Sequence, residues 1–171
     1  MELRDGDLEL RAWSEADVPA LVDACNDPEI SRWIPVIPQP YTEVDALAFV
    51  RGDLSTAPEH SFAITEAGQV VGAIGMTVNQ SRGASIGYWC AAAARNRGVV
   101  TRALRLVVRW GLEDLELERL ALMTDPDNVA SQRVAEKVGF RREGVLRSHL
   151  LHPDGRLRDS VMFSLLPGEL R

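Results

Sequence analysis

The loop ahead of one amphipathic segment combines cationic side chains with a glycine. Arg95 and Arg97 precede Gly98, and a helical pattern of apolar residues begins near Thr101. The first backbone N–H groups of a helix have no partner within the helix, and together with the helix dipole they attract anions. A glycine lets a phosphate approach the backbone without a Cβ in the way. The segment predicts a pyrophosphate site at this helix N-terminus, although a solvated basic loop would have the same composition.

A second polar segment follows at the next expected strand-to-helix junction. Asn128 lies at the junction, and Ser131 lies one turn into the helix. Taken singly, a helix N-cap and an exposed serine are the simpler interpretations of these two residues. The sequence contains neither the P-loop pattern nor the Gly-x-Gly-x-x-Gly pattern of dinucleotide sites. Any nucleotide would therefore be held in another way.

Hydrophobic periodicity predicts the elements that position these residues. Ser14 and Thr42 each precede an acid by three residues, which is typical of a capping box at a helix start. Gly139 is expected to end the helix that contains Ser131. The result is a mixed α/β sheet in one domain, residues 1–171. Strands are expected at 8–11, 60–66, 70–79, 84–90, 119–124, 140–150 and 157–166, and helices at 14–26, 42–54, from 101, and 128–138.

Composition narrows the class of protein. The chain has 171 residues, 46% of them hydrophobic, and a net charge of −6. An acidic balance argues against nucleic acid as the partner, because phosphate binding needs a basic surface. No apolar run reaches the roughly 20 residues of a membrane span, and the first ten residues have no signal-peptide core. Two cysteines and three histidines at unsuitable spacings predict no metal site. We expect a cytoplasmic protein that does not bind a membrane.

Taken together, the two polar segments resemble motifs of the GNAT superfamily, the Gcn5-related N-acetyltransferases. The cofactor motif Arg/Gln-x-x-Gly-x-Gly/Ala is matched by residues 95–100, with Asn96 and Val100 where glycine or alanine is usual. A second motif is similar to that of the ribosomal-protein alanine N-acetyltransferase-like group. It is matched by Asn128, Ser131, Val134, Lys137, Gly139, Phe140, Glu143 and Gly144.

The resemblance implies a mostly antiparallel twisted sheet, splayed in the middle and flanked by about four helices. It implies acetyl-CoA as acyl donor and direct attack by a neutral primary amine on the thioester. A backbone N–H near Cys90 would stabilise the oxyanion. Val100, being β-branched, either weakens donor binding or points into the core. The donor-binding residues it implies are Trp89, Cys90, Ala91, Arg95, Asn96, Arg97, Gly98, Val99, Val100, Thr101, Asn128 and Ser131.

The catalytic groups are assigned less directly. The resemblance implies that Ser131 faces the sulfur, where it could protonate the leaving thiolate. His149, Glu143 and His60 are the titratable candidates for a general base, and an ordered water chain is the alternative. A non-catalytic role is the favoured interpretation of each histidine, and Glu143 could instead tie its strand to the helix. Cys90 has no neighbouring His or Asp in sequence and is interpreted as a core residue.

The acceptor is expected opposite the donor, between the proline-rich loop 33–40 and the last hairpin. Trp33, Ile37 and Tyr88 are the candidate substrate residues. The loop could equally pack on the core or form a homodimer contact. The acceptor is a protein N-terminal α-amine, or alternatively a small amine such as an amino sugar, polyamine or antibiotic. A non-catalytic acyl-CoA-binding module is the third interpretation. Acids that could attract a basic acceptor are Asp23, Asp27 and Glu29, and arginines that could bind a carboxylate or a larger acyl group are Arg147, Arg156 and Arg158.

Overall fold

We examined the fold in a computed structural model that describes residues 2–54, 57–152 and 154–171. These residues form one eight-stranded sheet with the order β1-β2-β3-β4-β5-β6-β8-β7. Neighbouring strands are antiparallel except for β5 and β6, which are parallel. The strands are β1 (Leu3–Asp5), β2 (Leu8–Arg11), β3 (His60–Glu66), β4 (Gln69–Val78), β5 (Gly83–Cys90), β6 (Arg119–Thr124), β7 (Arg141–Leu151) and β8 (Leu157–Leu165).

Capping residues mark the beginning and end of two of the helices. Thr42 caps its helix through the N–H of Asp45, and Asn128 caps the helix of the second motif through the N–H of Ser131. Gly52 and Gly139 end these two helices with φ of +75° and +113°, a backbone conformation that favours glycine. The α-helices are α1 (Val18–Cys25), α2 (Pro28–Trp33), α3 (Glu43–Arg51), α4 (Val99–Glu113) and α5 (Val129–Val138).

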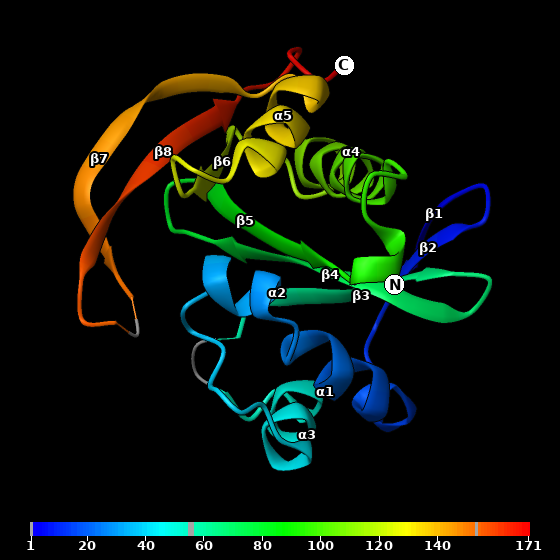
Figure 1. The fold of residues 1–171 in the computed structure, drawn as a ribbon. Helices are drawn as coiled ribbons and strands as arrows, with labels where there is room; N and C mark the ends of the chain where they lie inside the picture. The colour runs from blue at the N-terminus through cyan, green and yellow to red at the C-terminus, as the bar shows by residue number, and fades with distance from the viewer. Residues whose placement is uncertain (1, 55–56, 153) are drawn as a thin grey trace.

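The helices cover the two faces of the sheet. Helices α4 and α5 lie on one face, and α1, α2 and α3 lie on the other, while β7 and β8 arch away as a long hairpin (Figure 1). One buried apolar cluster joins α4 to the sheet, with Leu104, Val107 and Phe163 fully buried. A second, smaller cluster packs α1 against α3 around Leu21 and Ala46. Both layers therefore hold β5 between them.

Strand β5 separates from β6 halfway along its length. The two strands pair from Gly83 with Arg119 to Ile86 with Leu122. Beyond Ile86, β5 continues to Cys90 and stays paired with β4 along its other edge. An added Cβ at Gly72 would lie 2.6 Å from the Trp89 carbonyl oxygen, so β4 and β5 remain in close contact there. The result is a wedge between the carboxyl ends of two parallel strands.

The expected fold class is confirmed, and the differences in detail have local causes. The α3 helix ends at Arg51, not near residue 54, because Gly52 adopts a left-handed conformation. Among the strands and α-helices, β1 and the six-residue α2 were not predicted. Both are too short for a hydrophobic period to show. Among the described residues, no helix is long and apolar enough to cross a membrane.

Candidate active site

The wedge opens on one side into a cavity of about 520 Å³. Its walls come from the end of β5, the loop that follows, the first turn of α4 and the exposed face of α5. Among its lining residues are Trp89, Cys90, Arg95, Asn96, Gly98, Val99, Val100, Thr101, Asn128, Ser131, Arg133, Val134 and Lys137. We call this space the donor cavity.

The first turn of α4 directs backbone N–H groups at the donor cavity. The helix has Gly98 as its N-cap, with φ of +79°, and its first internal hydrogen bond is donated by the Arg102 N–H to the Gly98 oxygen (3.0 Å). The N–H groups of Val99, Val100 and Thr101 precede that bond, so they have no partner within the helix. Val100 is buried and also lines the donor cavity, and its effect on donor binding stays a prediction. Asn96 has φ of +61°, which asparagine tolerates better than most residues.

The two arginines of the loop are each paired with an acid. Arg95 forms an ion pair with Asp27, the N-cap of α2, and its Nε donates to the Cys90 carbonyl oxygen (3.3 Å). Arg97 donates to Glu66 at 2.7 Å and does not line the donor cavity. Their charges therefore fix the loop to β3, β5 and α2.

Helix α5 supplies other cations to the donor cavity. Arg133 and Lys137 both line it, one turn apart on the same face of the helix. Within residues 2–54, 57–152 and 154–171, no carboxylate lies within 4.0 Å of either side chain's charged nitrogens. Lys137 belonged to the recognised motif without a role, and Arg133 was missed. Their spacing of four residues was the available signal.

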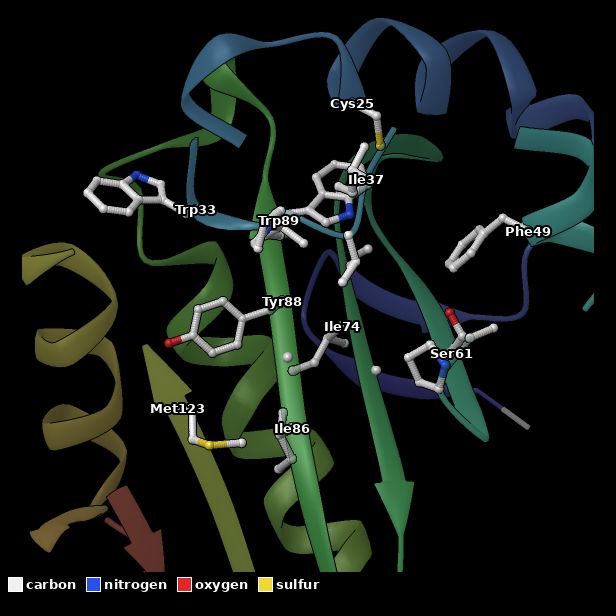
Figure 2. Close-up of a pocket in the computed structure, with 18 of the residues that line it drawn as sticks. Cys25, Trp33, Ile37, Phe49, Ser61, Ile74, Ile86, Tyr88, Trp89 and Met123 are labelled. Carbon is white, nitrogen blue, oxygen red and sulfur yellow. The ribbon is translucent and has the colours of Figure 1, made fainter. Parts of the chain in front are cut away.

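On the other side of β5 lies a second cavity, of about 440 Å³ (Figure 2). It is bounded by β4, β5 and β6 below and by α1, α3 and the proline-rich loop above. Trp33, Ile37 and Tyr88, the predicted substrate residues, all line it. Ser61 also lines it, and its hydroxyl accepts a hydrogen bond from the Trp13 indole (3.1 Å). We call this space the acceptor cavity.

The two cavities meet at a pair of hydroxyl groups. The Tyr88 hydroxyl lies 3.0 Å from Ser131 Oγ and 3.2 Å from the Ser131 carbonyl oxygen. Burial raises the pKa of Tyr88 to about 12, so this phenol stays protonated near neutral pH. The lining residues common to both cavities are Trp33, Ile34, Tyr88, Trp89, Asn128 and Ser131. A group entering from either side therefore arrives at the same two hydroxyls.

The predicted base candidates lie elsewhere. Glu143 forms a two-pronged ion pair with Arg119 (2.5 and 2.8 Å) and accepts from Ser164 Oγ (2.7 Å). The Arg119 guanidinium, with the Ser164 hydroxyl, lowers the pKa of Glu143 to about 2. A carboxyl so acidic is a poor general base, and Glu143 lines neither cavity, so its surroundings favour the structural alternative.

Neither histidine candidate reaches the cavities. His149 is exposed on β7, with Nδ1 3.0 Å from Ser160 Oγ, and its neighbour Leu150 lines the acceptor cavity. His60 packs edge-on against Trp110 at 4.9 Å. The described residues that line either cavity include no histidine. The β7 register shift between Leu146 and Leu150, which no local pattern indicated, decides which side chain faces inward.

The other predicted site residues come together. The predicted donor residues line the donor cavity, except for Ala91 and Arg97. The two expected charge clusters take no part in the acceptor cavity. Asp27 is bound to Arg95, and Arg158 is bound to Asp154 at 3.1 Å. Cys90 is half-buried at the edge of the donor cavity, and burial raises its pKa, so it is no activated nucleophile.

Comparison with known proteins agrees with this geometry. The model of the acetyltransferase (GNAT) domain family matches residues 7–141. The chain is 30% identical to the uncharacterized N-acetyltransferase p20 of Bacillus licheniformis, over 99% of this chain and 91% of that protein. Among solved structures, a GNAT-family acetyltransferase from Bacillus anthracis superposes with a TM-score of 0.86 at 25% identity, covering 97% and 98% of the two chains. Mycobacterium smegmatis RimJ, solved in complex with CoA-disulfide, superposes with a TM-score of 0.84 at 25% identity, covering 99% and 88%.

The sheet splayed between two parallel strands, with a cavity on each side of the splay, agrees with the fold of these acetyltransferases. The chain belongs to the GNAT acetyltransferase family, and it is an N-acetyltransferase.

The surroundings of Glu143 predict a structural role that can be separated from catalysis. Because its pKa is lowered in the folded protein, its ion pair stabilises the fold above the ordinary glutamate pKa of about 4.5. That stabilisation is lost as the pH falls from about 4.5 towards 2. Glu143→Gln should lower the midpoint of thermal unfolding at pH 7, and the gap to the unmodified protein should close in acid. The kcat of Glu143→Gln between pH 6 and 9 should stay within about twofold of that of the unmodified protein. Loss of the acid or alkaline limb of the pH–kcat profile would contradict the structural role of Glu143.

Proposed function

We propose that the protein transfers an acetyl group from acetyl-CoA to a primary amine at the Tyr88–Ser131 pair. The observation that carries the proposal is the meeting of two cavities at these hydroxyls, 3.0 Å apart. Each cavity has the character that one reactant needs. The thioester would enter from the donor side and the amine from the acceptor side.

Acetyl-CoA suits the donor cavity because that cavity offers separate partners for its parts. The free N–H groups at the start of α4 suit a pyrophosphate, and Arg133 and Lys137 add unpaired positive charge. The edge of β5 beyond Ile86, where β6 has separated, suits the amide groups of the pantetheine arm. The solved complex of Mycobacterium smegmatis RimJ with CoA-disulfide supports the same assignment.

The hydroxyl pair can supply the proton that the reaction requires. The amine nitrogen attacks the thioester carbon, a C–N bond forms, and the C–S bond breaks. The leaving thiolate takes a proton from Ser131 Oγ, and the Tyr88 hydroxyl, 3.0 Å away, can act as the donor of their shared hydrogen bond and leave the Ser131 proton free to face the sulfur. The proton that the nitrogen loses passes to water, and Ser131 Oγ takes a proton back from water, so the serine is regenerated and the step balances. The oxyanion is held by a backbone N–H near Cys90.

The acceptor that fits this chemistry best is an α-amine, such as a protein N-terminus. The described residues lining the acceptor cavity include no carboxylate and no imidazole, so the amine must arrive already neutral. An α-amine, with a pKa of about 7.7 to 8.0, is partly neutral at pH 7.5, whereas a lysine amine, at about 10.4, is almost fully charged. Similarity to the ribosomal-protein-serine acetyltransferase of Escherichia coli supports a protein acceptor. A homodimer formed through the proline-rich loop stays a prediction.

Removal of either hydroxyl should slow the chemical step without weakening donor binding. Ser131→Ala should lower kcat at least tenfold, and Tyr88→Phe should lower it by a smaller factor, because the thiolate loses its proton source or that source loses its orientation. The dissociation constant of acetyl-CoA, measured by calorimetry, should change less than threefold. Unchanged kcat in both variants would refute the placement of the reaction here. Normal binding with no turnover of any amine in the unmodified protein would instead favour a binding module.

The positive charges of Arg133 and Lys137 on α5 should each strengthen the binding of acetyl-CoA. Arg133→Ala and Lys137→Ala should each weaken acetyl-CoA binding about tenfold, the size expected for one charge-assisted hydrogen bond. The effect should shrink at high salt. Arg109→Ala, an exposed arginine on α4 outside both cavities, is the matched control and should bind normally. Equal affinity for all four proteins would show that the phosphates lie elsewhere.

A further inference from the structure

The wall of the acceptor cavity is mainly apolar. The described residues that line it include no Asp, Glu, Lys, Arg or His. Trp33, Trp89 and Phe49 supply aromatic surface, and Ile37 and Ile74 supply branched aliphatic surface (Figure 2). A cavity of this composition gains free energy from covering apolar surface and offers nothing to balance a buried ammonium.

The polar atoms of this wall do not alter that character. The thiol of Cys25 has a pKa raised to about 12 by burial, and burial also raises the pKa of the Tyr41 phenol. Both groups are therefore neutral near pH 7. Ser61 already accepts a hydrogen bond from Trp13, and Tyr88 is engaged with Ser131. Thr124 and the side-chain NH2 of Asn128 are the other side-chain hydroxyl and amide groups among the described lining residues, so few polar contacts are left for a hydroxyl-rich or polycationic acceptor.

Charged side chains near the rim of the acceptor cavity are bound to other residues. Asp27 faces Arg95 on the donor side of α2, and Glu29 lines the donor cavity and accepts from the Trp33 indole at 3.3 Å. At the hairpin, Arg158 is paired with Asp154. Neither the acids nor the arginine is aimed at the acceptor. The charge-based specificities that the sequence allowed have no support at the cavity.

We infer that the acceptor is a primary amine carried by a bulky, apolar and otherwise uncharged group, aromatic or branched aliphatic. The inference rests on the proposed function, which it deepens by naming the substrate class. The amine lies at Tyr88 and Ser131, and its apolar group fills the space under the proline-rich loop against Trp33, Ile37 and Phe49. A peptide whose first residue is apolar and a small arylalkyl amine share this chemistry. Polyamines and amino sugars do not share it.

A substrate panel tests this specificity. The release of the CoA thiol from acetyl-CoA is measured with phenylalanine amide, a tetrapeptide beginning with Phe, spermidine and glucosamine. We expect kcat/KM for the better phenylalanine compound to exceed that for spermidine and glucosamine at least 100-fold, and the faster of the two shows whether a peptide or a small molecule is the source. Equal or faster turnover of spermidine or glucosamine would overturn the inference and leave the proposed function standing. No thiol release with any amine would overturn both.

A charge placed in the wall of the acceptor cavity tests the inference, and a charge placed outside both cavities is the matched control. Met123 on β6 lies just beyond the last residue paired with β5 and extends towards the cavity, with 41% of its surface exposed (Figure 2). Val145 on β7 is 42% exposed and lies outside both cavities. Met123→Glu should lower kcat/KM for the phenylalanine compounds at least tenfold and narrow their advantage over spermidine, whereas Val145→Glu should change neither.

Binding can be followed separately from turnover. Trp33 and Trp89 line the acceptor cavity, so phenylalanine amide should change the tryptophan fluorescence of the protein saturated with CoA. Spermidine at the same concentration should not. A Met123→Glu protein that folds normally but keeps the original substrate ratio and the original fluorescence response would show that the acceptor enters elsewhere.

Discussion

The architecture of the site depends on the incomplete pairing of two parallel strands. Strands β5 and β6 share four paired positions and then separate, because the end of β5 stays paired with β4 while the end of β6 stays paired with β8. Backbone groups at the end of β5 are thereby left for a ligand, which a fully paired sheet would not allow. The same separation gives Tyr88 room to reach across to Ser131 on α5. The separation of β5 from β6 thus leaves the edge of β5 free for the acyl donor and allows the Tyr88–Ser131 contact.

Charge is distributed unequally across that opening. On the donor side, unpaired Arg133 and Lys137 accompany the N-terminus of α4, an arrangement suited to an anionic ligand. The motif arginines act mainly within the protein, since Arg95 joins the cofactor loop to α2 through Asp27. On the acceptor side, the described wall is uncharged. A single strand thus separates a surface suited to an anion from an apolar one, and the proposed reaction site lies where the two meet.

Much of this was predictable from sequence, and the rest depends on geometry that local patterns do not encode. Capping residues and periodicity located α4, α5 and most strands, and the resemblance to the GNAT motif placed Asn128 and Ser131 at the site. The role of Glu143 depends on Arg119, which lies on β6 and has no sequence relation to it. The exclusion of His149 depends on an irregular register in β7. The apolar character of the acceptor wall arises from segments spread from Leu21 to Leu150, so no single motif could indicate it.

The most direct test of the account is a crystal structure with a non-hydrolysable acetyl-CoA analogue. The account predicts the pyrophosphate at the N–H groups of Val99, Val100 and Thr101, the pantetheine arm along β5 beyond Ile86, and the sulfur position within hydrogen-bonding distance of Ser131 Oγ. The acetyl group should point past Tyr88 into the apolar cavity. An analogue bound with its acetyl group away from the Tyr88–Ser131 pair would contradict the central claim, that the reaction occurs where the two cavities meet.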